Sequence, residues 1–111
     1  MFVEKRHYPR FKRSVPVEVH AEGSDAPIHC NTSDLSLGGC YIESMYPFPK
    51  GTAVELKLQL DDTLLILARV VTCDPQFGNG FQFERILPED LELLSHFLET
   101  CAKQEAETAQ H

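Results

Sequence analysis

The sequence has no long apolar run, and this absence excludes one class of protein. A membrane-spanning helix needs roughly 18–20 predominantly apolar residues. The most apolar stretch, Leu64 to Val71, is short and contains Arg69. The basic N-terminus has no apolar segment behind it, so a secretory signal is not expected either. We therefore expect a cytoplasmic protein that does not insert into a membrane.

The four cysteines are widely spread, and the motifs of metal sites and catalytic centres are missing. Cys30, Cys40, Cys73 and Cys101 form no CxxC pair and no Cys/His pair at zinc spacing. Reduced, partly buried thiols are favoured over two disulfides in a chain without a secretory signal. The five histidines form no HExxH motif, and neither a GxSxG elbow nor a P-loop is present. The sequence therefore predicts no metal, no cofactor and no enzyme activity.

Positive charge is also scarce, and half of it lies close to the N-terminus. The chain has 10 Lys and Arg against 17 Asp and Glu, for a formal net charge of −7. Five of the basic residues fall in KRHYPRFKR, residues 5–13, so residues 1–13 carry +4 and the remainder carries −11. An acidic body argues against broad binding to duplex DNA, which needs many phosphate contacts. A local basic cluster fits either a small anionic ligand or a solvated tail.

Alternating apolar residues predict six short strands. Val15, Val17 and Val19 alternate with proline or polar residues in the first strand, and Phe81 and Phe83 alternate in the last. Clusters of Gly, Pro, Asn and Asp separate the apolar runs. The strands are expected at about 15–19, 28–33, 38–44, 54–60, 64–73 and 81–83.

Two predictions concern the C-terminal half. Asn79-Gly80 has the chemistry of a two-residue hairpin turn, so the last turn is expected there. Pro88 suits the first position of a helix, and apolar residues then recur at helical spacing. That stripe, which should dock onto the sheet, is formed by Leu91, Leu94, Leu98 and Cys101.

These elements define a fold class. Closely spaced hairpins favour antiparallel pairing, and six strands in so short a chain favour a small barrel that hides its edges. The prediction is an all-β protein: a small six-stranded antiparallel β-barrel with a C-terminal α-helix. Residues 1–13 are expected to form a basic flexible arm, residues 14–103 the barrel with its helix, and residues 104–111 a polar, frayed tail.

Two short motifs carry a resemblance. The first is RxxxR, formed by Arg6 and Arg10, and the second is DxSxxG, formed by Asp34, Ser36 and Gly39. Each is common alone, but their order and spacing together resemble the PilZ domain, the bacterial receptor module for cyclic di-GMP. The resemblance extends from about Glu4 to the C-terminal helix, and it implies a PilZ-like barrel that binds this nucleotide.

The chemistry of these residues suits such a ligand. An arginine fork can meet phosphate oxygens in pairs or bond the O6/N7 edge of guanine. The Asp34 carboxylate can accept the N1–H and N2–H donors of guanine, and the Ser36 hydroxyl can donate or accept. Gly39 allows a close approach of backbone. The further candidates are Gly38, which has the same freedom, and Lys5, which bears on whether one or two ligands bind.

The resemblance implies a stand-alone receptor or adaptor. Ligand would draw the arm into a closed clasp and change a surface that a downstream protein partner reads, with the protein a monomer or a dimer. One alternative is an interaction module that keeps the PilZ fold without binding nucleotide; its mark would be loss of the arginines or of Asp34, Ser36 and Gly39, and neither set is lost. Considered alone, the DxSxxG segment can also be an ordinary turn. A second alternative is a single-stranded nucleic-acid binder, but the chain has no Trp and its body is acidic, so no nucleic acid is expected as partner.

Overall fold

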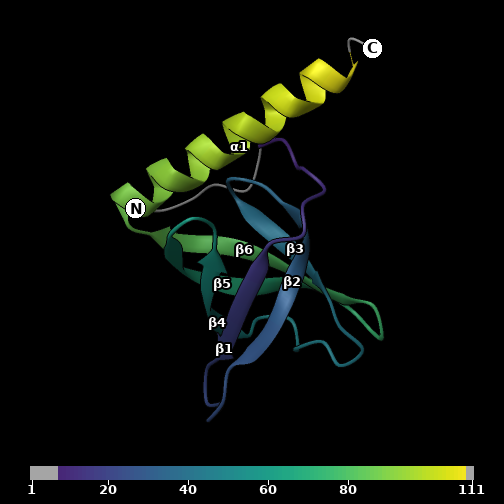
Figure 1. The fold of residues 1–111 in the computed structure, drawn as a ribbon. Coiled ribbons are helices and arrows are strands. Elements are labelled where there is room, and N and C mark those ends of the chain that lie inside the picture. Colours follow the sequence, from purple (N-terminus) through teal and green to yellow (C-terminus); the bar gives the residue numbers. More distant parts are fainter. Residues whose placement is uncertain (1–7, 110–111) are drawn as a thin grey trace.

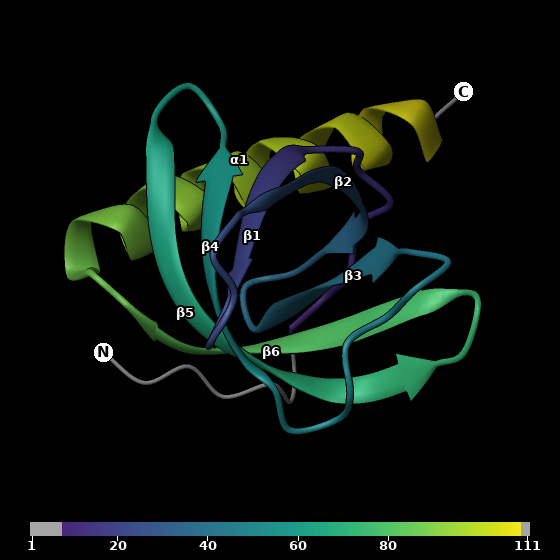
Figure 2. The ribbon, with the colours of Figure 1, turned by 90° about the horizontal axis from the view of Figure 1, so that it is seen from below.

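The computed structural model describes residues 8–109, which form a closed barrel of six antiparallel strands beneath one helix (Figure 1). The order around the barrel is β1-β2-β3-β6-β5-β4, and β4 pairs back onto β1 (Figure 2). Because the barrel is closed, no strand within residues 8–109 is left with a row of unpaired N–H and C=O groups along one edge. This confirms the predicted fold class. The strands are β1 (Pro16–Ala21), β2 (Ile28–Leu35), β3 (Gly39–Glu43), β4 (Ala53–Gln59), β5 (Thr63–Asp74) and β6 (Gly78–Ile86).

Strand β5 shows how the sequence pattern builds the barrel. Leu64 and Ile66 are fully buried, whereas Leu65 and Leu67, between and after them, are 41% and 45% exposed. The alternation follows from the strand geometry, which sends successive side chains to opposite faces. The pairing of β5 with β6 shifts register twice, and such irregularities let a long strand bend around a small barrel.

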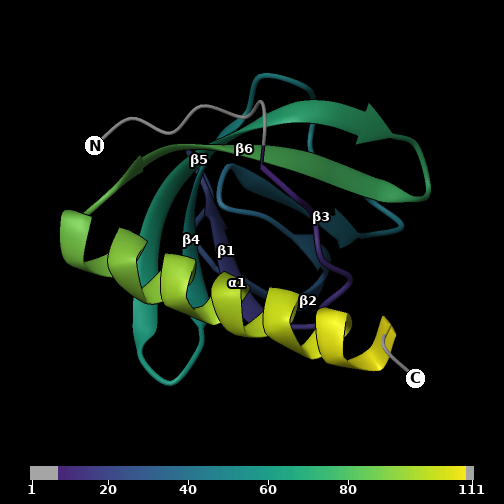
Figure 3. The same cartoon turned by 90° about the horizontal axis from the view of Figure 1, so that it is seen from above.

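The helix α1 (Pro88–Ala109) lies across one end of the barrel (Figures 1 and 3). Leu94, Leu98 and Cys101 are buried, which confirms that the predicted stripe faces the barrel. The helix ends later than predicted, because it continues through residues 104–109, where we expected a frayed tail. Residues 104–109 contain no Gly or Pro, and their Gln, Glu and Ala residues favour the helical conformation.

The prediction of a turn at Asn79-Gly80 is wrong. Both residues lie within β6, and the turn comes earlier, at residues 75–77, where Gln76 adopts a positive φ of 68°. The Asn79 side chain is buried, and its amide makes backbone bonds instead of turning the chain. It accepts from the Phe48 N–H at 2.8 Å and donates to the carbonyls of Phe48 at 2.9 Å and Thr72 at 3.2 Å. Asn79 therefore ties the β3–β4 loop to β6.

We expect Asn79→Ala to lower the free energy of unfolding by roughly 2–4 kcal/mol, because it removes three hydrogen bonds and leaves backbone groups of Phe48 unpaired. Urea unfolding followed by circular dichroism measures this loss. Asn31→Ala, at an exposed position of β2, is the matched control and should change stability by less than about 0.5 kcal/mol. Equal stabilities of the two variants would contradict the role given to Asn79.

Candidate functional site

The segment before β1 is pinned along β2. Phe11 and Leu35 exchange two backbone hydrogen bonds of 2.9 Å, and the Phe11 side chain is only 6% exposed. Further along, the Thr32 hydroxyl donates to the Arg13 carbonyl at 2.6 Å and accepts from the Val15 N–H at 3.0 Å. The predicted flexible arm therefore includes residues that are docked in the structure. This docking places Arg10 beside the end of β2.

Arg10 and Asp34 of the two predicted motifs come together. The distance from Arg10 Nη1 to Asp34 Oδ1 is 3.7 Å, and the two side chains are 67% and 28% exposed. That distance is too long for a hydrogen bond, and an exposed pair of this kind contributes about 0–1 kcal/mol. The other two arm residues predicted for the site, Lys5 and Arg6, lie outside the residues that the structure describes.

The carboxylate of Asp34 has an unused acceptor. Its Oδ1 atom is buried, and it accepts no hydrogen bond from any group in residues 8–109. Buried polar atoms in proteins are nearly always paired, because an unpaired one loses its bonds to water without replacement. The site therefore presents a negatively charged acceptor that a donor from a ligand can satisfy.

Ser36 shapes the loop between β2 and β3. Its hydroxyl oxygen accepts from the N–H groups of Gly38 and Gly39, both at 3.1 Å, and donates to the Gly39 carbonyl at 3.3 Å. The Ser36 N–H also donates to the Gly39 carbonyl at 2.8 Å. Ser36 is only 5% exposed. These bonds use the one donor and the two acceptor sites of its hydroxyl inside the turn. Ser36 thus sets the path by which the chain passes from Asp34 to β3.

The two glycines bring this loop against β6. The Gly38 carbonyl accepts from the Phe83 N–H at 2.9 Å. At Gly39, a Cβ atom would overlap the carbonyl oxygen of Phe81, so any other residue there would push the strands apart. Gly39 is needed because of this close approach, which the sequence alone could not distinguish from a need at Gly38.

Tyr41 belongs to the same surface and was missed by the motif analysis. It pairs with Asp34 across β2 and β3, and its hydroxyl donates to Asp74 Oδ2 at 2.7 Å. This hydrogen bond is the main cause that raises the pKa of Tyr41 to about 12, with burial and nearby negative charges adding to it. The phenol therefore stays neutral at physiological pH. The available signal was its position two residues after Gly39, on the same face of a strand.

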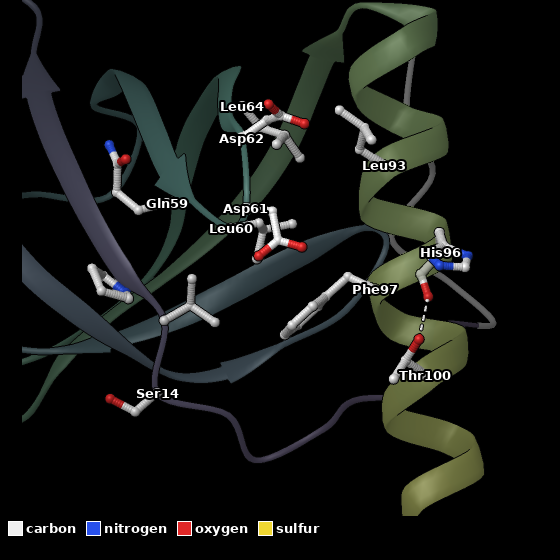
Figure 4. A pocket seen from close by; sticks show the side chains of 12 residues that line it. Ser14, Gln59, Leu60, Asp61, Asp62, Leu64, Leu93, His96, Phe97 and Thr100 are labelled. Atoms are coloured by element: carbon white, nitrogen blue, oxygen red, sulfur yellow. Dashed lines mark hydrogen bonds between the residues drawn. The ribbon is translucent and has the colours of Figure 1, made fainter.

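A groove lies on another part of the molecule. This groove of about 480 Å³ runs between α1 and the β4–β5 turn, and its lining includes Asp61, Asp62 and Phe97 (Figure 4). Neither Arg10 nor Asp34 lines it. The two carboxylates repel an anionic ligand, so this groove is a poor site for a phosphate group.

No set of His, Cys, Asp and Glu side chains suited to a metal ion occurs within residues 8–109. The helix in that range does not have the length and apolar character that crossing a membrane requires.

This sequence and this fold have known relatives. The family model of the PilZ domain matches residues 4–100. The fold is similar to the inhibitor of motility (MotI/DgrA) of Bacillus subtilis, with a TM-score of 0.74 and 19% identity over 95% of this chain and 53% of that chain. It is also similar to the PilZ domain of Escherichia coli YcgR, determined with c-di-GMP, with a TM-score of 0.68 and 15% identity over 96% and 98% of the chains. For the PilZ domain of CeSA from a cellulose synthesizing bacterium, the TM-score is 0.64 and the identity 22%, over 87% and 98%.

These matches differ in how much of each relative they cover. The chain spans about half the length of the Bacillus protein, at 53%, and nearly all of the two isolated PilZ domains, at 98% each. A search of curated proteins found no match to this sequence. At identities of 15–22%, the structural likeness establishes the fold alone. The family match covers most of the sequence, and the chain therefore belongs to the PilZ domain family.

Proposed function

We propose that this protein is a receptor for cyclic di-GMP and that the nucleotide binds where the N-terminal segment meets the β2–β3 loop. Arg10 and Asp34 carry the proposal, because a guanidinium lies 3.7 Å from a carboxylate whose buried oxygen has no hydrogen-bond donor among residues 8–109. Membership in the PilZ domain family supports it, as does the similarity to the YcgR domain determined with c-di-GMP.

Each group suits one part of the ligand. Asp34 accepts the N1–H and N2–H donors of one guanine, which gives the Oδ1 atom the hydrogen-bond donor that it lacks. Arg10 then meets a phosphate or the O6/N7 edge of a guanine with its planar fork. Little is lost when Arg10 turns away from Asp34, because the exposed pair contributes only about 0–1 kcal/mol. Arg6 and Lys5 of the same segment add positive charge around the phosphates.

The signal to a partner protein depends on the N-terminal arm, residues 1–13. Ligand draws the residues that precede Phe11 over the barrel, while Phe11 itself stays anchored beside Leu35. The surface formed by the closed segment differs from that of the open one, and a downstream protein partner reads the difference. Such a switch works only if the ligand binds the closed arrangement more tightly than the open one. In this view the protein acts as an adaptor.

We expect calorimetric titration to show binding of cyclic di-GMP by the wild type and binding weaker by roughly 10- to 100-fold for Arg10→Ala. The loss corresponds to a charge-assisted hydrogen-bonded contact. Lys57→Ala is the matched control. It also removes one positive charge and one exposed ion pair, with Glu18, but it lies on β4, which faces β3 across the barrel.

The titration separates the possible outcomes. Equal losses for the Arg10 and Lys57 variants would mean that only overall charge matters and would contradict the site. No binding by the wild type would contradict the receptor function and favour a PilZ-fold interaction module. Tighter binding of a single-stranded oligonucleotide than of cyclic di-GMP would contradict the proposal that cyclic di-GMP is the ligand.

A further inference from the structure

The side chain of Tyr41 is held at both of its ends. Its backbone lies in the middle of β3, hydrogen-bonded between β2 and β6. Its hydroxyl, at the far end, donates to Asp74 Oδ2 at 2.7 Å, near the end of β5. A ring that is anchored in this way has one orientation, so it loses little freedom when another group packs on it.

The ring covers two glycines of β6. A Cβ atom at Gly78 would come within 2.9 Å of Cε1 of Tyr41, and one at Gly80 within 3.8 Å of Cδ2. These two ring atoms are opposite one another, and alternate residues of a strand share a face. The ring therefore lies flat over the bare backbone of β6, and its other face points away from the barrel.

Asp34 and Tyr41 share this outer surface. They are partners in the pairing of β2 with β3, directly after a register shift between Thr32 and Asp34, so their side chains are cross-strand neighbours. Their sequence neighbours Leu35, Cys40 and Ile42 are buried in the core, so both side chains project outward. A flat aromatic face thus adjoins a carboxylate that has an unused acceptor.

We propose that Tyr41 is the stacking platform for one guanine of the bound cyclic dinucleotide, while Asp34 bonds the edge of that base. The inference rests on the proposed function and adds a specificity residue to the same site. Every base has a π face, but only guanine offers adjacent N1–H and N2–H donors to the neighbouring carboxylate. Because the phenol stays neutral, it does not repel the phosphates of the ligand.

Three variants test the platform by titration with cyclic di-GMP. Tyr41→Leu keeps an apolar cover over Gly78 and Gly80 but has no π face, and it should bind roughly 5- to 150-fold more weakly. Tyr41→Phe keeps the ring and should bind within about threefold of the wild type. Tyr46→Leu is the matched control, since Tyr46 is 88% exposed on the β3–β4 loop, and it should bind as the wild type does.

A spectroscopic readout separates stacking from a purely structural role. Proton NMR should show the ring protons at position 41 shifted upfield when cyclic di-GMP is added, in the wild type and in Tyr41→Phe, since a stacked base shields them. Thermal unfolding of each variant shows whether a weaker affinity reflects lost folding.

The outcomes are distinct. Wild-type binding together with an unchanged affinity of Tyr41→Leu, or with no ring shift, would overturn the platform and leave the receptor function standing. A wild type that does not bind would overturn both. If Tyr41→Leu proves unfolded, the ring shift in Tyr41→Phe still decides the question.

Discussion

Replacing Asp34 with alanine should lower the affinity for cyclic di-GMP by roughly 30- to 5,000-fold, the largest functional effect that we expect. The carboxylate is the acceptor for two guanine donors, and truncating one partner of a buried, charged hydrogen-bonded pair costs about 2–5 kcal/mol. Calorimetric titration measures the change. Glu18→Ala is the matched control, because it removes an acidic residue from an ion pair with Lys57, and Glu18 lies opposite His29, near the other end of β2 from Asp34.

The same substitution should leave the protein as stable as the wild type or more stable. Asp34 Oδ1 is buried without a donor within residues 8–109, so the folded protein loses no hydrogen bond there when the carboxylate is removed. The 3.7 Å contact with Arg10 offsets this by at most about 1 kcal/mol. Urea unfolding without ligand checks the sign. A variant destabilised by more than about 2 kcal/mol would show that Asp34 has a structural role and contradict our interpretation of the unpaired oxygen.

Replacing Gly39 with alanine should have the largest effect on stability, a loss of about 3 kcal/mol or more in the free energy of unfolding. The added methyl group overlaps the carbonyl oxygen of Phe81, which is backbone of the paired strand and cannot rotate away. Relief therefore requires β3 and β6 to separate. The turn held by Ser36, and with it the position of Asp34, would be lost with this contact.

Gly23→Ala provides the comparison for Gly39→Ala. A Cβ atom at Gly23 meets no atom within 4 Å, but φ is +82°, so this variant measures the cost of an unfavourable backbone conformation, about 1–2 kcal/mol, without a clash. Denaturant unfolding of both variants gives the difference. If Gly39→Ala lost no more stability than Gly23→Ala, the close approach of β3 to β6 would be contradicted.

Several features were predictable because they depend on neighbours in sequence. The alternation at Leu64, Ile66 and their neighbours predicted a strand, since the side-chain period of a strand is a local property. The stripe that includes Leu94 and Leu98 predicted the helix and the face that docks. The two short motifs indicated the PilZ family, and the family match over residues 4–100 confirms it.

Two polar side chains have partners in the folded chain that the sequence did not predict. Asn79-Gly80 favours a tight turn when considered alone, but the buried amide of Asn79 bonds to Phe48, far away in the sequence. The Ser36 hydroxyl accepts from the N–H groups of Gly38 and Gly39 within its own loop, and its contact with the ligand stays a prediction. In both cases a side chain with several hydrogen-bonding roles takes the partner that the folded chain supplies.

The sequence by itself determined the barrel, the helix and the family, because the spacing of apolar residues and the two short motifs depend only on residues that are close together in the chain. Only the tertiary structure decided that Arg10 reaches Asp34, because that contact depends on the pairing of Phe11 with Leu35. It also decided that Tyr41 lies over the glycines of β6 beside the same carboxylate. The sequence of one strand does not specify which residues of another strand lie opposite it, so these contacts could not be predicted from the local pattern.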